Sequence, residues 1–156
     1  MAQCGKAEGQ VEIRCNADKI FNLWARNTPQ LSKYCSSFPK IELLEGDNCY
    51  TPGATLCWSY VSPVGGKAEH VKITLEEIDD NKRSYIYKVT EGQIMNDYYN
   101  SWREKIEFTP KGENCTIAKW SVIEYEKKCE DAPHPQQYVD FLLDCIKETA
   151  PHVSCA

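Results

Sequence analysis

The C-terminal stretch, residues 133–153, constrains the fold more than any other part of the chain. Apolar residues recur there at helical spacing, and polar residues fall on the opposite side. Pro135 suits a first helical turn, whereas Pro151 biases Ala150 away from helical geometry, so the helix is predicted to end or kink there. One amphipathic helix cannot bury its own apolar face, so it needs a sheet to pack against. Its stripe comprises Tyr138, Val139, Phe141, Leu142, Leu143, Cys145, Ile146 and Thr149.

The preceding residues are predicted to form that sheet. Residues 6–15 alternate between apolar and polar side chains, which is typical of a half-buried strand. Asn16 offers an N-cap to a short helix, and a second short helix is predicted over residues 29–35. We therefore expect an α+β fold with a seven-stranded curved antiparallel sheet around the C-terminal helix. The later strands are predicted at residues 41–45, 54–61, 67–78, 84–91, 98–108 and 115–126.

Length and charge exclude several functions. The 156 residues are predicted to form a single domain over residues 1–156, large enough to bury a substantial core. A net charge of −5 with no basic stripe argues against nucleic acid as a partner. The sequence has no apolar run of about 20 residues that could span a membrane, and no apolar signal-peptide core. We expect a cytoplasmic protein with no stable membrane insertion.

The nine cysteines show no pattern of a disulfide framework or a metal site. Their number is odd, their spacing is irregular, and no CxxC motif or zinc-type Cys–His spacing occurs. They are interpreted as reduced thiols that mostly act as small core residues. We therefore predict no metal and no cofactor, and no cysteine visibly sits at a cationic site that would favour thiol catalysis.

Short motifs occur along the chain: VEI at residues 11–13, ADKIF at 17–21, VTEG at 89–92, FTPKG at 108–112, KW at 119–120 and EYEK at 124–127, with the helix start at 131–141. These segments resemble the Bet v 1 family of plant pathogenesis-related class 10 proteins, in particular its major latex protein branch. The resemblance is carried by the order of elements and by short motifs that span nearly the whole chain. It implies a helix-grip fold with a large apolar cavity that binds lipophilic molecules, and some relatives catalyse cofactor-free condensation, isomerisation or cyclisation.

Two departures from the family pattern narrow the function. The segment that corresponds to the family's glycine-rich loop, residues 45–53, keeps only Gly46 and Gly53, which is too few for a phosphate cradle. Residues 62–66 do not match the gate of the abscisic-acid-receptor branch. The first departure argues against nucleotide binding and ribonuclease activity. The second excludes the abscisic-acid-receptor branch.

Glu104 is the first candidate for chemistry. It shares the parity of Trp102, Ile106 and Phe108, the side of its strand assigned to the cavity. A carboxylate facing an apolar cavity should have a raised pKa, which suits a general acid or base. Alternatively, a local bulge turns Glu104 outward or a lysine pairs with it. Trp102 beside it either stacks on a ligand or fills the core.

Other candidates depend on which face of each strand points inward. Tyr85 and Tyr87 could orient a phenolic or carbonyl ligand through their hydroxyls, or could simply pack. His70 has the parity opposite to Val71, so it is a surface residue unless the register is reversed, in which case it joins Glu104 as an acid–base pair. In the last strand, Trp120 and Val122 compete with Ile117, Lys119 and Ile123 for the inner face, and the sequence leaves that choice open.

Two functions follow as hypotheses. One is binding of a hydrophobic plant molecule, whether terpenoid, steroid-like, phenolic or alkaloid, by a carrier or defence-related protein that is a monomer or weak dimer. The other is a cofactor-independent cyclase or isomerase that folds a reactive intermediate in the cavity. Candidate catalytic residues are Glu104, Tyr85, Tyr87 and His70. Candidate ligand-binding residues are Leu23, Trp24, Trp58, Tyr85, Tyr87, Trp102, Glu104, Phe141, Leu142 and Cys145.

Overall fold

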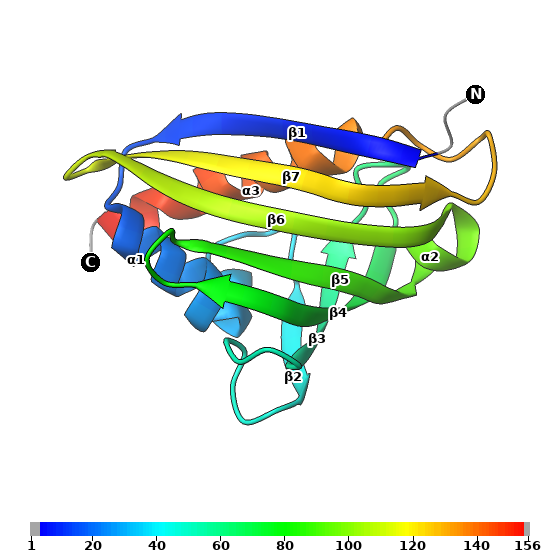
Figure 1. The fold of residues 1–156 in the computed structure, drawn as a ribbon, viewed down its shortest axis with the longest axis horizontal. Helices are drawn as coiled ribbons and strands as arrows, with labels where there is room; N and C mark the ends of the chain where they lie inside the picture. Colours follow the sequence, from blue (N-terminus) through cyan, green and yellow to red (C-terminus); the bar gives the residue numbers. More distant parts are fainter. Residues whose placement is uncertain (1–3, 155–156) are drawn as a thin grey trace.

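The computed structural model describes residues 4–154 and contains a seven-stranded antiparallel sheet that curves around a long C-terminal helix (Figure 1). The predicted fold class is confirmed. The strand order is β1-β7-β6-β5-β4-β3-β2, so the first and last strands in the chain are neighbours. The strands are β1 (Cys4–Ile13), β2 (Lys40–Glu45), β3 (Thr55–Val61), β4 (Ala68–Asp79), β5 (Ser84–Gly92), β6 (Tyr99–Gly112) and β7 (Cys115–Lys127).

The register of β6 against β7 decides which residues face the interior. Ile106 is paired with Trp120, and both side chains are fully buried. Lys119 lies on the outer face, where its Nζ is 3.2 Å from Glu8 Oε2. The ambiguity in the last strand is therefore resolved in favour of Trp120 and Val122. This face buries the large Trp120 ring, whereas the opposite face would bury the charge of Lys119.

A register shift lies directly opposite the candidate carboxylate. Arg103 pairs with Glu124, whereas the next residue, Glu104, pairs with Val122, so Ile123 is the extra residue and the irregularity falls on β7. The alternation within β6 is preserved across this point, with Trp102, Glu104 and Ile106 all buried. The bulge expected as an alternative thus exists, but it does not turn Glu104 outward.

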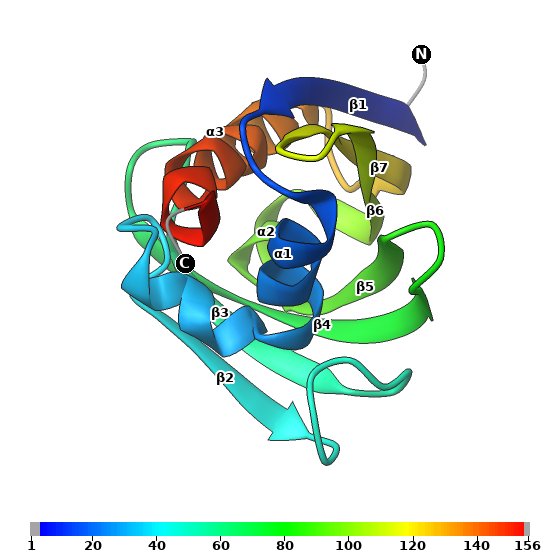
Figure 2. The ribbon, with the colours of Figure 1, turned by 90° about the vertical axis from the view of Figure 1, so that its left-hand side faces the viewer.

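The C-terminal helix α3 (Gln136–Ser154) packs mainly on β1 and β7, and the rest of the sheet curves away from it (Figure 2). Val139 and Ile146 are fully buried on its inner face. The sequence predicted that the helix ends or kinks near Ala150; it does not end there, because α3 continues through Pro151 to Ser154. Tertiary contact outweighs the local bias, because the His152 ring in the last turn stacks on Tyr34 with their centroids 4.8 Å apart.

Two short helical segments and one extra turn lie between β1 and β2. Asn16 caps the first helix as predicted, since its Oδ1 accepts hydrogen bonds from the backbone N–H groups of Asp18 at 3.0 Å and Lys19 at 3.2 Å. The chain continues through a π-helical turn, which the sequence did not reveal, into a 3₁₀ helix. The segments are α1 (Ala17–Phe21), η1 (Asn22–Arg26) and η2 (Thr28–Lys33).

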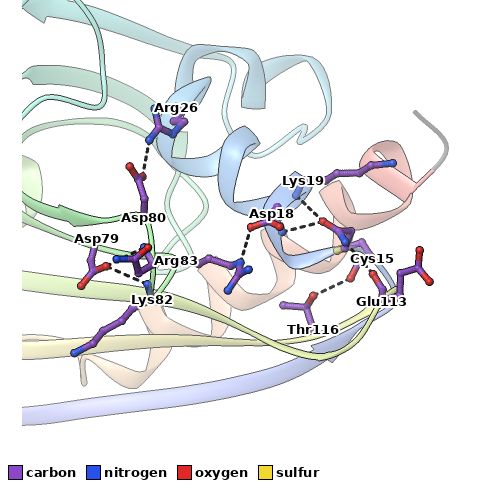
Figure 3. A network of polar contacts seen from close by, with 12 residues as sticks. Cys15, Asp18, Lys19, Arg26, Asp79, Asp80, Lys82, Arg83, Glu113 and Thr116 are labelled. Carbon is purple, nitrogen blue, oxygen red and sulfur yellow. Dashed lines mark hydrogen bonds and ion pairs between the residues drawn. The ribbon is translucent and has the colours of Figure 1, made fainter.

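Exposed ion pairs connect these helices to the turn between β4 and β5 (Figure 3). Arg83 Nε lies 2.6 Å from Asp18 Oδ1, and Arg26 Nη2 lies 2.5 Å from Asp80 Oδ1. A buried hydrogen bond from Thr116 Oγ1 to the carbonyl of Cys15, 2.8 Å long, joins the end of β1 to β7. The helices therefore close one end of the space between sheet and α3, as Figure 2 shows.

Helix α2 (Gln93–Asp97) was not predicted from the sequence. It lies between the end of β5 and the start of β6. It follows Gly92, whose φ of 138° favours glycine and where an added Cβ would lie 2.4 Å from the carbonyl oxygen of His70. Ile94 is the buried residue of this helix. A five-residue helix is too short to give a periodic sequence signal, so a helix could not be predicted there.

Two expectations concern features outside the fold itself. In the part of the chain that the structure describes, no helix is long and apolar enough to cross a membrane. The eight cysteines within residues 4–154 are free thiols, and four of them are buried: Cys15, Cys35, Cys49 and Cys145. The ninth, Cys155, lies outside the described residues.

Candidate functional site

A cavity of about 60 Å³ lies between α3 and the middle of the sheet. Aromatic side chains dominate its wall. Among the described residues that line it, Glu104 is the one with a carboxylate. Phe141 and Leu142 of α3 are half-buried, so they lie where the cavity approaches the surface. The wall is formed by Phe38, Trp58, Tyr60, Val71, Ile73, Tyr87, Val89, Ile94, Trp102, Glu104, Tyr138, Phe141 and Leu142.

The cavity is much smaller than the large one that the resemblance implied. Ligand pockets usually measure about 300–1,000 Å³, whereas this one has about 60 Å³. Packed rings take up the remaining space. Trp24 is fully buried and lies with its ring centroid 5.6 Å from that of Trp120 and 6.3 Å from that of Trp58. A steroid-sized molecule would require displacement of several of these rings.

Glu104 is held in a fixed position by two donors. Its carboxylate accepts a hydrogen bond from Trp102 Nε1 at 2.7 Å and another from the Tyr87 hydroxyl on the neighbouring strand. The pairing of Tyr87 with Glu104 in the β5–β6 ladder brings these two side chains together. The residue is 3% exposed, so the carboxylate is shielded from water.

Burial raises the pKa of Glu104 to about 7, although the hydrogen bonds from Tyr87 and Trp102 act to lower it. Trp120 also lowers this pKa, although its indole N–H has no partner at hydrogen-bonding geometry among the described residues. Burial likewise raises the pKa of the Tyr87 hydroxyl well above its ordinary range, so this hydroxyl stays a neutral donor. A carboxyl group that titrates near neutral pH can both give and take a proton.

The two tyrosines of β5 have different positions. Tyr87 lines the cavity and reaches Glu104, as described above. Tyr85 is buried but lies outside the cavity wall, with its ring stacked against that of Tyr87 at a centroid distance of 6.3 Å. Tyr85 packs against a wall residue and does not itself line the cavity, and its role in ligand binding or catalysis stays a prediction.

His70 is not part of the cavity, so the predicted acid–base pair with Glu104 is wrong. Its side chain is exposed on the outer face of β4, where Nδ1 lies 3.0 Å from Ser59 Oγ. Val71, the next residue, lines the cavity instead. The alternation of the strand permits only one of two successive side chains to point inward, and the apolar residue takes that place.

Three further candidates lie away from the cavity wall. Trp24 is core, and its Nε1 donates a 3.0 Å hydrogen bond to Thr149 Oγ1 on α3. Leu23 borders a separate surface groove near the end of α3. Cys145 is buried and contacts Cys35. By contrast, Trp58, Trp102, Phe141 and Leu142 lie in the wall as placed by the sequence analysis, although their roles toward a ligand stay predictions.

With this geometry in view, comparison with known proteins shows what the chain is related to. The model of the pathogenesis-related protein Bet v 1 family matches residues 2–156. The chain belongs to the Bet v 1 family. Among relatives, it is 34% identical over 151 residues to MLP-like protein 43 of Arabidopsis thaliana, covering 96% of this chain and 92% of that protein.

Solved structures agree with membership of the Bet v 1 family. The crystal structure of ginseng major latex-like protein 151 from Panax ginseng superposes with a TM-score of 0.86 at 27% identity, covering 97% of this chain and 98% of that one. A norcoclaurine synthase point mutant from Thalictrum flavum, in complex with a transition-state analogue, has a TM-score of 0.71 at 17% identity and covers 96% and 95%. At that identity the second likeness concerns the fold alone.

Sequence reasoning missed several wall residues of this Bet v 1-family chain. Tyr60 shares the parity of Trp58 on β3, so alternation alone could have identified it. Ile94 comes from the unpredicted helix α2, and Phe38 from the loop before β2, and neither carried a local signal. Within residues 4–154, no cluster of His, Cys, Asp and Glu could hold a metal ion.

Proposed function

We propose that the protein binds a compact hydrophobic small molecule in the cavity between α3 and the sheet. The observation that carries this proposal is an aromatic and aliphatic wall with a buried carboxylate in it, a combination typical of small-molecule sites. The fold of the family, with its sheet curved around one helix, is compatible with such a role. Terpenoid, phenolic and alkaloid ligands of small size fit the proposal better than steroids, because the cavity measures about 60 Å³.

A ligand larger than the cavity would have to move side chains at its edge. Phe141 and Leu142 are half-buried on α3, so their displacement costs less apolar burial than displacement of the fully buried rings. α3 packs chiefly on β1 and β7, and the sheet curves away from it toward β2, β3 and β4 (Figure 2). Entry is therefore proposed to occur along this side of α3.

The binding proposal is tested by filling the cavity. Val89 is 5% exposed and lines the wall, so a Val89→Phe substitution should occupy much of the free volume. Val61→Phe is the matched control, because Val61 is 40% exposed and outside the wall. Titration with small neutral terpenoids and phenols, followed by tryptophan fluorescence, should give saturable binding that Val89→Phe weakens about tenfold or more and Val61→Phe leaves unchanged. Equal binding by both variants, with both folded by circular dichroism, would refute the cavity as the site.

A second function is favoured by one specific observation, the Glu104 carboxyl with a pKa of about 7. Such a group could move a proton during a cofactor-independent isomerisation or cyclisation, while the wall holds the substrate in one conformation. Tyr87 would orient the carboxylate through its hydrogen bond. Norcoclaurine synthase has this fold, so the fold itself is compatible with catalysis.

Deuterium exchange separates the two functions without a known substrate. A small ketone that occupies the cavity should exchange its α-hydrogens with D₂O faster in the presence of the protein, and Glu104→Gln should abolish the acceleration. As Glu104 acts as the base, the exchange rate should rise with pH through about 7 and then level off. Saturable binding with no exchange above the rate in buffer would support binding and reject proton transfer.

A further inference from the structure

Among the residues that the structure describes, none gives the Glu104 carboxylate a positively charged partner. Burial and neutral hydrogen-bond donors are the causes that set its pKa, and no lysine, arginine or histidine is among them. The two cations next to it along the strand, Arg103 and Lys105, have the opposite parity and belong to the outer face. There the Arg103 guanidinium pairs with Glu76 at 2.7 Å and Glu124 at 3.7 Å. A buried anion without a cation is costly, and a cation delivered into the same space would remove much of that cost.

The carboxylate also has unused capacity to accept hydrogen bonds. An ionised carboxylate offers about four lone-pair sites, whereas the described contacts to Glu104 are one from Trp102 and one from Tyr87. Because Glu104 is part of the cavity wall, a group bound in the cavity can reach the remaining sites. A group that binds the ionised carboxylate must donate hydrogen bonds, since the ionised form only accepts them.

The rest of the wall suits an ammonium group. Seven of the residues that line the cavity are aromatic, and among the described residues none of the lining side chains is a lysine, arginine or histidine. Aromatic faces attract a cation, and Trp does so most strongly. The aromatic members are Phe38, Trp58, Tyr60, Tyr87, Trp102, Tyr138 and Phe141.

A second, independent observation points to a polar group on the ligand. Trp58 is 6% exposed and lines the cavity, yet its Nε1–H has no hydrogen-bond partner in the part of the chain described. A buried donor that has no acceptor destabilises the folded state, because it has lost its hydrogen bonds to water. A ligand with an acceptor atom could satisfy this donor while its cationic end contacts Glu104.

We infer that the ligand of this cavity is a compact lipophilic amine whose ammonium group pairs with the Glu104 carboxylate within the aromatic wall. This inference rests on the proposed binding function and adds the chemical class of the ligand. An oxygen acceptor elsewhere on the amine would complete the match by accepting from Trp58 Nε1. Neutral hydrocarbons and alcohols would use the same volume without neutralising the carboxylate.

The test compares two probes of matched shape, cyclopentylamine and cyclopentanol, at about pH 8, where the amine and Glu104 both carry charge. Protein-detected NMR titration gives the affinity and locates the site for each probe. In the unmodified protein the amine should bind about tenfold tighter than the alcohol. Glu104→Gln should remove this preference, so that the two probes bind with affinities within about twofold of each other. Glu107→Gln, on the outer face of the same strand, should retain the preference.

The outcomes distinguish the two levels of the argument. Equal binding of both probes in the cavity would overturn the inference and leave the binding function standing. Failure of both probes to bind would count against the binding function as well. A preference for the amine that survives in Glu104→Gln would place the cation elsewhere and overturn the inference. Should Glu104→Gln not fold, the ¹³C carboxyl signal of Glu104 in the unmodified protein decides, since amine binding at about pH 6.5 should shift it toward the ionised position.

Discussion

Glu104→Gln is expected to stabilise the protein at alkaline pH and to have much less effect in mild acid. The carboxyl has a raised pKa in the folded state, so the folded protein holds this proton more tightly than the unfolded chain does. Its contribution to stability is therefore present below the ordinary pKa of 4.5 and is lost as the pH rises toward about 7. Glutamine carries no charge at any pH and avoids that loss.

The size of the effect follows from the shift. Between 4.5 and about 7 the pKa difference is about 2.5, and each unit corresponds to about 1.4 kcal/mol, giving about 3 kcal/mol at pH 8. At pH 5 the same linkage gives less than about 1 kcal/mol. Glutamine also changes the hydrogen bonding, because its amide nitrogen cannot accept from Trp102 Nε1. That cost is independent of pH, so the informative quantity is the change in the stability difference from pH 5 to 8.

Urea unfolding at the two pH values measures this quantity directly. The free energy of unfolding of Glu104→Gln minus that of the unmodified protein should rise by about 2–3 kcal/mol from pH 5 to pH 8. Glu107→Gln on the outer face should differ from the unmodified protein by less than about 0.5 kcal/mol at either pH. A stability difference for Glu104→Gln that stays flat across this range would show that the carboxyl is not held in a low-dielectric site, and the argument from burial would fail.

Two other substitutions test the surroundings of the cavity. Gly92→Ala should lower the free energy of unfolding by more than about 3 kcal/mol, because φ is 138° and the new Cβ would lie 2.4 Å from a backbone oxygen of β4. Gly53→Ala, with φ of 96° and nothing within 4 Å of the new Cβ, should lower it by only about 1 kcal/mol; thermal unfolding measures both. Similar losses for both would refute the role of close packing. Tyr87→Phe should raise the pKa of Glu104 above about 7 in a ¹³C NMR titration, because it removes a donor to the ionised carboxylate. Tyr85→Phe, whose hydroxyl makes no described bond to Glu104, should change it less, and the reverse order would contradict the geometry.

The elements of this fold were predictable because their signals are local. Alternation in residues 6–15 and the helical stripe of residues 133–153 each depend on a few neighbouring side chains, and both elements are present in the structure as β1 and α3. Helix α2 and the π-helical turn η1 were missed because each has five residues, fewer than two turns of a periodic pattern. The helix end expected before Pro151 does not occur, because His152 stacks on Tyr34, a tertiary contact that no local pattern shows.

The sequence alone predicted which side chains share a face of each strand, Glu104 with Trp102 and Ile106, and His70 opposite to Val71, because a strand's period of two follows from backbone geometry. The registers in the folded sheet decided that Glu104 lies inside and His70 outside. The sequence did not determine the volume of the cavity. That depends on how rings from β3, β5, β6, β7 and α3 fill one shared space, and they fill it to about 60 Å³. The absence of a cation at Glu104 among the described residues is likewise decided by the tertiary structure. Packing and electrostatic pairing join residues far apart in the chain, so no local pattern encodes them.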